Sequence, residues 1–320
     1  MASISAGLGP TSQRSGSMPA IRVRDLRKSY GSIEAVRGID FDVEEGEVFG
    51  FLGPNGAGKT TTVEILEGYR QRSAGDVQVL GHDPARGERD LRERIGIVLQ
   101  ETGVERLLKV AEVLAQYCGY YPHPRPVDEL LAITGLEAKR DEVVKKLSGG
   151  QKRRLDLALG LAGDPELIFL DEPTTGFDPS ARRDAWEVIR NLRSLGKTIF
   201  LTTHYMDEAQ VLADRVAVIS GGLIVAEGPP DRLAGRDSAT EIRFALPTGT
   251  SAADLPDLGP ATVSTETRGL VVRAEEPTPA LHTLTGWSLE RGVALEGLTV
   301  ARPSLEDVYL TLTAAAEGAA

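Results

Sequence analysis

The sequence predicts an α/β fold with a glycine-rich loop at its centre and a smaller α+β domain at its C-terminal end. Three observations support this prediction. The apolar run at 47–53 is typical of a buried strand, and the glycine-rich loop after it leads into a helical pattern at 61–68. Two later apolar runs, at 166–171 and 197–204, also read as buried strands. A strand, a glycine-rich loop and a helix therefore follow one another in the order of a phosphate-binding loop.

The loop itself reads GPNGAGKTT over residues 53–61 and fits the pattern G-x-x-x-x-G-K-[ST]. Glycines let several backbone N–H groups point into one concavity, and the following helix adds the positive end of its dipole. We expect Lys59 to reach the β- and γ-phosphates of a nucleotide and the Thr60 hydroxyl to ligate magnesium. A chance glycine-rich turn is the alternative, and the flanking strand and helix argue against it.

The length and amino-acid composition limit the classes of protein to which the chain can belong. The 320 residues are enough for roughly two domains, with 41% hydrophobic and 26% charged residues. The net charge of −11 argues against a nucleic-acid binder, because such proteins usually carry a basic surface. The single cysteine, Cys118, forms no disulfide within the chain and is expected to be a small buried residue.

No apolar run approaches the roughly 18 residues of a membrane span, so a membrane role requires a partner. Residues 1–20 are rich in serine, glycine and alanine, and we expect them to form a disordered tail.

The remaining elements of the first domain, 21–235, follow in order. An antiparallel β element is expected over 21–53, and a helical subdomain over about 101–163, broken by the proline-rich stretch 120–126. An amphipathic helix is expected over 180–195. Further strands are expected at 76–80, 95–99, 215–220 and 223–228.

A change in composition near 229–238 marks the start of the second domain, 236–320. Strands are expected at 240–247, 269–277 and 293–301, and helices at 281–292 and 304–314, with Ser304 as the N-cap of the last helix. This domain carries no recognisable catalytic pattern.

Two further motifs lie in the first domain. LIFLDEP (167–173) places Asp171 and Glu172 at the end of a strand, where the first carboxylate can reach magnesium and the second can polarise a water. LSGGQ (147–151) places Ser148 and two glycines at a helix N-terminus, a second anion site. An acidic turn and a serine-capped helix are the plain alternatives.

These motifs, with Gln100 between them, the TTGFDP turn (174–179) after them and His204 last, resemble the nucleotide-binding subunit of an ABC transporter over 21–232. The resemblance implies a P-loop NTPase core with antiparallel β and α-helical subdomains. TTHYMDEAQVLADRVAVI (202–219) and the C-terminal PSLEDVYLTLTA (303–314) resemble the daunorubicin-resistance-type drug exporters.

The resemblance also implies a role for each matching residue. Tyr30 would stack on adenine, Glu172 would be the general base and His204 would contact the γ-phosphate. Magnesium would be held by Thr60, Gln100 and Asp171. The phosphates would be held by Gly53, Pro54, Asn55, Gly56, Ala57, Gly58, Lys59, Thr60 and Thr61. A second copy, bound head to tail, would contribute Ser148, Gly149, Gly150 and Gln151. Asp178 would lie at the seam, the interface between the two copies. Phe177 stands where leucine is more usual.

The resemblance predicts an ATPase that uses ATP and Mg²⁺ and powers efflux of a hydrophobic drug, antibiotic or lipid. Its partners would be a second copy and a separate polytopic membrane permease at the cytoplasmic face, and no nucleic acid. One alternative is a soluble ABC ATPase that acts on ribosomes or nucleic acid, and another is a regulator whose C-terminal domain senses a ligand.

Several other residues are expected to have structural roles. His82, His123 and His282 lack the spacing of metal ligands. Arg153 and Arg154 are expected on a solvated helix face, and Trp186 and Trp287 in packing.

Overall fold

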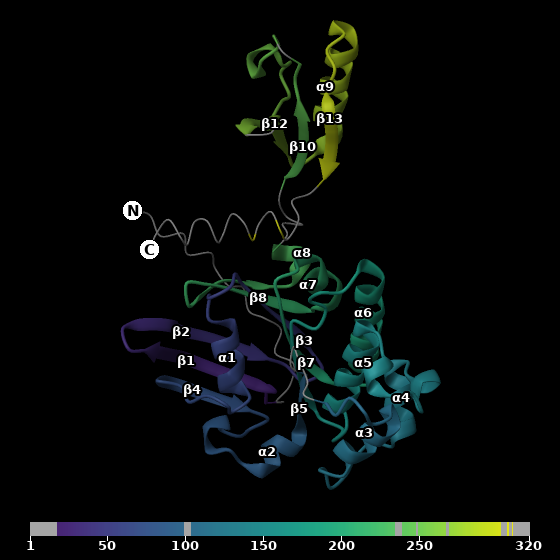
Figure 1. The fold of residues 1–320 in the computed structure, drawn as a ribbon. Helices are drawn as coiled ribbons and strands as arrows, with labels where there is room; N and C mark the ends of the chain where they lie inside the picture. The colour runs from purple at the N-terminus through teal and green to yellow at the C-terminus, as the bar shows by residue number, and fades with distance from the viewer. Residues whose placement is uncertain are drawn as a thin grey trace.

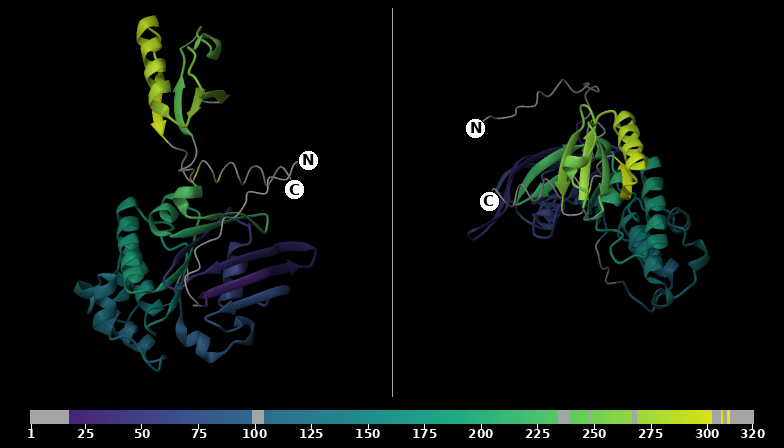
Figure 2. Two further views of the ribbon diagram at one scale, coloured as in Figure 1. Left: turned by 180° about the vertical axis from the view of Figure 1, so that it is seen from behind. Right: turned by 90° about the horizontal axis from the view of Figure 1, so that it is seen from above.

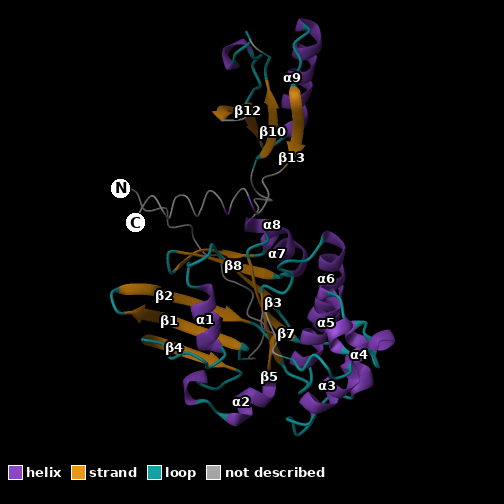
Figure 3. Cartoon of the chain, in the orientation of Figure 1, coloured by secondary structure: helices purple, strands orange, loops and turns teal. Residues whose placement is uncertain are grey.

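The computed structural model describes residues 18–98, 104–233, 239–247, 249–266 and 269–301, together with Glu306 and Tyr309. Three sheets organise this part of the chain (Figures 1 and 3). No helix among the described residues is both long enough and apolar enough to cross a membrane.

A six-stranded sheet forms the centre of the first domain, in the order β5-β6-β7-β3-β8-β9. All neighbours are parallel except β8 and β9, which pair antiparallel. Every residue of β3 and β7 is buried, which explains the apolar VFGFL of β3 and the apolar IFL at the centre of β7. The strands are β3 (Val48–Leu52), β5 (Ile95–Val98), β6 (Leu167–Asp171), β7 (Thr198–Thr203), β8 (Arg215–Ser220) and β9 (Leu223–Gly228).

One face of this sheet packs against a three-stranded antiparallel sheet, β2-β1-β4, and against helix α1. Five phenylalanines fill this interface, and Phe200 lies with its ring centroid 5.6–6.1 Å from those of Phe41, Phe49, Phe51 and Phe169. The elements are β1 (Ile21–Tyr30), β2 (Ile33–Val43), β4 (Ala74–Val79) and α1 (Lys59–Leu66). The predicted antiparallel β element before the loop is therefore confirmed.

The other face of the central sheet packs against a group of helices. Alternate residues of the strands point to this side, including Ile168 and Leu170 of β6 and Ile199 and Leu201 of β7. The helices of this group are α3 (Val110–Cys118), α4 (Val127–Thr134), α5 (Gly149–Gly160) and α6 (Pro179–Ser194). Figure 2 shows them and the three-stranded sheet on opposite sides of the molecule. Helix α2 (Arg89–Arg94) packs through Leu91 on the side of the three-stranded sheet, and α7 (Met206–Leu212) and α8 (Pro230–Leu233) complete the helices of the first domain.

Helices α1 and α6 agree with the helices expected at 61–68 and 180–195 to within two residues, whereas α2, α7 and α8 were not predicted. The proline-rich stretch 120–126 separates α3 from α4 as predicted, and Cys118 is buried. Short 3-10 turns at Glu137–Lys139 and Val144–Lys146 connect α4 to α5. Helix α6 begins one residue earlier than expected, because Asp178 caps it and Pro179 takes its first position.

The C-terminal sheet is antiparallel, in the order β11-β12-β10-β13, and α9 covers one face through Ala280 and Leu284. Its elements are β10 (Thr240–Ala245), β11 (Thr262–Glu266), β12 (Gly269–Ala274), α9 (Pro277–Arg291) and β13 (Glu296–Ala301). Strand β11 was not expected, because TVSTE is a polar sequence at a sheet edge. Helix α9 begins four residues before the predicted start, at a proline.

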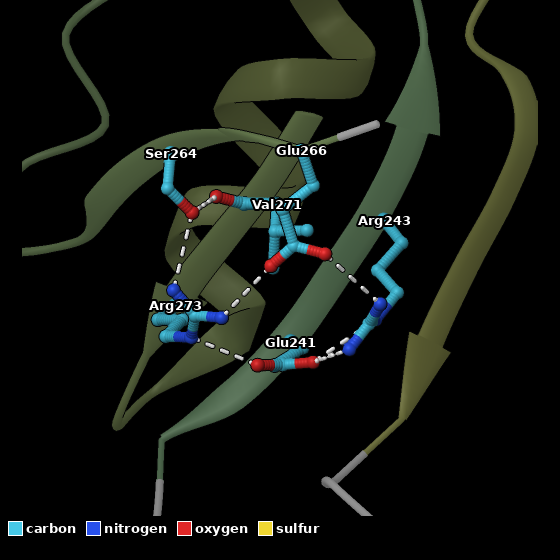
Figure 4. A network of polar contacts seen from close by, with 6 residues as sticks. All are labelled: Glu241, Arg243, Ser264, Glu266, Val271 and Arg273. Carbon is cyan, nitrogen blue, oxygen red and sulfur yellow. Dashed lines mark hydrogen bonds and ion pairs between the residues drawn. The ribbon is translucent and has the colours of Figure 1, made fainter. Parts of the chain in front are cut away.

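The opposite face of this sheet carries a closed network of charges (Figure 4). Arg243 and Arg273 each donate to both Glu241 and Glu266, at 2.5–3.4 Å, and Arg273 also donates to Ser264 Oγ at 3.1 Å. Alternation along the strands separates these residues from the apolar residues under α9.

The predicted helix at 304–314 lies outside the described residues, apart from Glu306 and Tyr309. The Tyr309 side chain packs against the apolar cluster that contains Met206, Ala209 and Val218.

Candidate functional site

The site lies at the carboxyl ends of β3, β6 and β7, which are adjacent in the sheet and parallel. The glycine-rich loop follows β3, Asp171 ends β6 with Glu172 directly after it, and His204 follows β7. Segments more than a hundred residues apart in the sequence therefore meet at one edge, as ligand sites in open α/β sheets do.

Two glycines of the loop are required by close backbone contacts. A Cβ at Gly53 would lie 2.4 Å from the Ile219 carbonyl oxygen, and one at Gly58 would lie 2.5 Å from that of Ala35. Gly58 also has φ of 108°, in the left-handed region, at the N-cap of α1. The loop can take this path only because these positions lack side chains.

Lys59 is 94% buried at the start of α1, with 6% of its surface exposed. Its Nζ donates to the carbonyl oxygens of Gly53 at 2.6 Å and Pro54 at 3.1 Å. Burial lowers the pKa of Lys59, and the charges of Glu172 and Asp171 act in the opposite direction. The ammonium therefore lies inside the loop, near two carboxylates.

A cavity of about 410 Å³ opens at the loop. The residues that line it come from the loop, from α1 and from the end of β6, with one from β2: Ala35, Asn55, Gly56, Gly58, Lys59, Thr60, Thr61, Asp171 and Glu172. The structure thus brings Thr60 to the same cavity as the two carboxylates. No group of three or more possible metal ligands among His, Cys, Asp and Glu occurs in the described residues.

Glu172 has an unusual backbone conformation, with φ of 45°. Its N–H donates to Thr202 O at 3.0 Å and to Thr202 Oγ1 at 3.2 Å, and these contacts hold the conformation. The Thr202 hydroxyl also donates to the Asp171 carboxylate. Strained non-glycine residues of this kind concentrate at functional sites.

The Glu172 side chain is held on both sides. Its Oε1 lies 3.2 Å from His204 Nδ1, and its Oε2 accepts a hydrogen bond from Thr175 Oγ1 at 3.1 Å. The His204 ring lies against Tyr205, with centroids 4.1 Å apart, and the Arg182 guanidinium lies 4.1 Å from the Tyr205 ring centroid. Glu172 and His204, distant in the sequence, therefore form a contact pair.

Tyr30 is 40% exposed beside the start of α1, and its hydroxyl lies 3.5 Å from Thr61 Oγ1. Lys28 and Arg70 lie over the ring, 5.1 and 5.3 Å from its centroid, and Arg70 pairs with Glu64 at 2.5 Å. The tyrosine is thus close to the glycine-rich loop, with cations around its ring.

The LSGGQ segment forms the N-terminus of α5. Ser148 and Gln151 make a capping box, in which Gln151 N donates to Ser148 Oγ at 3.3 Å and Ser148 N donates to Gln151 Oε1 at 3.0 Å. Among the described residues, this segment contributes nothing to the lining of the loop cavity. Gly149 instead lines a neighbouring cavity of about 460 Å³, together with Glu172, Thr175 and Phe177.

Asp178 caps α6, because its Oδ1 accepts hydrogen bonds from Ser180 N and Ala181 N, both at 2.9 Å. Gln100 lies outside the described residues, so its predicted contact with magnesium stays a prediction.

The expectation for Arg153 was wrong. Its side chain is buried, donating through Nε to Pro173 O and through Nη2 to Asp171 O, both at 3.1 Å. Its neighbour Arg154 does point outward, to Asp184. The two arginines therefore point to different sides of α5.

Two buried carboxylates near the site also escaped the sequence analysis. Glu67, at the end of α1, has its pKa raised to about 8 by burial, with smaller contributions from the charges of Asp171 and Glu64. Glu208, in α7, accepts hydrogen bonds from Thr174 Oγ1 and from Trp186 Nε1. A possible signal for Glu208 was its i,i+4 spacing to Leu212 on the apolar side of a short helix.

Comparisons with known proteins agree with this geometry. A family model described as ABC transporter matches residues 36–175, and one described as ABC transporter domain-containing protein-like, C-terminal domain, matches residues 240–304. The chain is 38% identical to the daunorubicin resistance ATP-binding protein DrrA3 of Streptomyces coeruleorubidus, over 92% of this chain and 96% of that protein. It is 39% identical to the Nod factor export ATP-binding protein I of Ralstonia nicotianae, over 93% and 95%.

Solved structures show the same fold. The structure of cbiO1 from Clostridium perfringens, described as part of the ABC transporter complex cbiONQ, matches with a TM-score of 0.63 and 29% identity, over 69% of this chain and 92% of that one. The dimeric ATP-binding cassette MJ0796 bound to ADP and Pi matches in fold, with a TM-score of 0.58 and 24% identity over 65% and 98%.

Proposed function

Because the chain belongs to the ATP-binding proteins of ABC transporters, and is an ATPase, we propose that two copies enclose ATP and drive export through a separate membrane subunit. The observation that carries the proposal is the loop cavity, which brings Lys59, Thr60, Asp171 and Glu172 together.

In this proposal the glycine-rich loop binds the phosphates of ATP. The backbone N–H groups of the loop and of the α1 N-terminus, between Asn55 and Thr61, donate to phosphate oxygens. The Lys59 ammonium, already inside the loop, moves from the carbonyl oxygens of Gly53 and Pro54 to the β- and γ-phosphates. Tyr30 stacks on the adenine.

Glu172 acts as the general base, because its carboxylate lines the cavity and is fixed by Thr175 and His204. It accepts the proton of the water that attacks the γ-phosphate. His204, 3.2 Å from Glu172, contacts the γ-phosphate and stabilises the charge that spreads over it during transfer.

The residues also fit a magnesium ion, since Thr60 and Asp171 offer oxygen ligands in the same cavity and Gln100 would complete the set. The ion would supply positive charge beside the β- and γ-phosphates.

The second copy supplies the other half of the site. Within one chain, no described residue of the LSGGQ segment lines the loop cavity, although the N-terminus of its helix offers N–H groups and the positive end of a dipole to an anion. Ser148, Gly149, Gly150 and Gln151 would therefore close over ATP from the partner copy, and Asp178 would lie at the seam.

The transported molecule is proposed to be a hydrophobic or amphiphilic small molecule. The relatives named above are described by daunorubicin resistance and by Nod factor export, and both matches cover nearly the whole chain. The membrane subunit that binds this molecule would hold the chain at the cytoplasmic face.

The test is to isolate the tagged Glu172→Gln protein with ATP from gently solubilised membranes and to identify what accompanies it. We expect a polytopic membrane protein that is absent when Lys59→Ala protein is used as the control. Recovery of ribosomes or nucleic acid without a membrane protein would overturn the transport function while leaving the ATPase chemistry in place.

A further inference from the structure

Glu208 is a completely buried carboxylate behind the proposed site, with 0% of its surface exposed. Its Oε1 accepts hydrogen bonds from Thr174 Oγ1 at 2.8 Å and from Trp186 Nε1 at 3.1 Å. Burial raises the pKa of Glu208, while hydrogen bonds from Thr174 and Trp186 act in the opposite direction. A buried carboxylate is costly unless it is well bonded, and these two donors offset part of that cost at Oε1, whereas Oε2 makes no hydrogen bond to any described residue.

The donors come from the segments that carry the proposed reactive residues. Thr174 lies in the loop between Glu172 and Asp178, and its neighbour Thr175 donates to Glu172. Trp186 belongs to α6, the helix capped by Asp178. Glu208 itself lies in α7, which begins at Met206, two residues after His204. Glu208 therefore joins the helix that follows His204 to the loop that follows Glu172.

We propose that Glu208 is a positioning residue for ATP hydrolysis, which fixes the 172–178 loop relative to His204. This inference rests on the proposed function, because it acts through the assigned general base. The coupling between the 172–178 loop and His204 then lies within one copy. Glu208 holds the Glu172 end of this loop through Thr174, and the Asp178 end through Trp186 and α6.

Arg153 completes the support from the other side. Its guanidinium bonds to the carbonyl oxygens of Asp171 and Pro173, which flank Glu172 in the chain. The segment from Asp171 to Thr174 is therefore held by a buried arginine of α5 and by a buried glutamate of α7.

The test compares three variants by steady-state ATPase kinetics. In Glu208→Ala the Thr174 hydroxyl and the Trp186 N–H lose their acceptor, and we expect kcat to fall about 10- to 100-fold with KM for ATP changed less than about threefold. In Glu208→Gln the amide oxygen accepts both hydrogen bonds, so kcat is expected to stay within about threefold of wild type. Glu187→Ala, at an exposed position of α6, serves as the matched control and is expected to match wild type.

A double-mutant cycle separates positioning from general weakening of the fold. Thr174→Val removes the hydroxyl that Glu208 accepts and is expected to lower kcat to a similar extent. Combined with Glu208→Ala it should add less than about twofold further, because both changes break one link. If kcat of the double variant instead falls by the product of the two single fold-losses, the proposal is overturned.

A folded Glu208→Ala protein with wild-type kcat would also overturn it. If Glu208→Ala does not fold, Thr174→Val decides alone: a wild-type kcat in that variant refutes the link. Failure of the proposed function looks different, because Glu172→Gln would then hydrolyse ATP at the wild-type rate.

Discussion

Replacing Glu67 with glutamine tests the effect of a buried carboxyl group beside the proposed site. Only 8% of Glu67 is exposed, and its Oε1 makes no hydrogen bond to any described residue. Burial, and then the charges of Asp171 and Glu64, raise its pKa from 4.5 to about 8. The folded protein therefore binds this proton more tightly than the unfolded chain does.

The sign and size of the effect follow from this difference. The stability contribution is fully present below the unfolded pKa and is lost as the pH rises through the folded value. Over the whole window the loss of unfolding free energy is about 5 kcal/mol, at about 1.4 kcal/mol for each pH unit. Between about pH 6 and pH 9 it is about 2.5 kcal/mol.

The assay is urea unfolding followed by circular dichroism at several pH values in this range. In Glu67→Gln the carboxyl is replaced by a neutral amide, so the stability should vary with pH by about 2.5 kcal/mol less than in wild type. Glu137→Gln changes an exposed glutamate and should keep the wild-type pH dependence. If Glu67→Gln shows the wild-type slope, the carboxyl is ionised in the folded protein and the reasoning fails.

Three further predictions follow. Glu172→Gln should lower ATP turnover at least about 100-fold and leave ATP affinity within about threefold, measured by phosphate release and nucleotide titration; a wild-type rate would show that another group is the base. Arg153→Met should lower the free energy of unfolding by about 2–4 kcal/mol, because two buried carbonyl oxygens lose a charged donor, whereas Arg154→Met should cost less than about 1 kcal/mol; equal losses would contradict the different burial of the two side chains. Phe200→Ala should cost about 3–5 kcal/mol at the centre of the phenylalanine cluster, against less than about 1 kcal/mol for Tyr120→Ala, whose residue is 68% exposed; a small loss at position 200 would mean that the core closes around the gap.

The parts that were predictable from the sequence depend on neighbours in the chain. The glycine-rich loop, the strand before it and helix α1 are contiguous, so their order alone indicated how Lys59 would be placed. The strand boundaries were also close, because complete burial of β3 and β7 leaves short apolar runs, VFGFL and IFL, in the sequence.

The unpredicted parts depend on partners far along the chain. Arg153 bonds to carbonyl oxygens 18 and 20 residues away, and Glu208 bonds to a hydroxyl 34 residues away. Arginine and glutamate are also the residue types expected on a solvated helix face. Only the packing of α5 and α7 on the sheet therefore identifies these two side chains as buried. The pairing of Glu172 with His204 similarly arises because β6 and β7 are adjacent.

The contacts of Lys59 have a consequence for the proposed binding of a nucleotide. The ammonium loses its water shell when the chain folds, since two carbonyl oxygens of its own loop take over as acceptors. In the proposed function, a phosphate that reaches Lys59 would therefore exchange one set of oxygen partners for another and would not strip water from a hydrated cation. Such a preorganised cation would reduce the ordering and desolvation that binding otherwise requires.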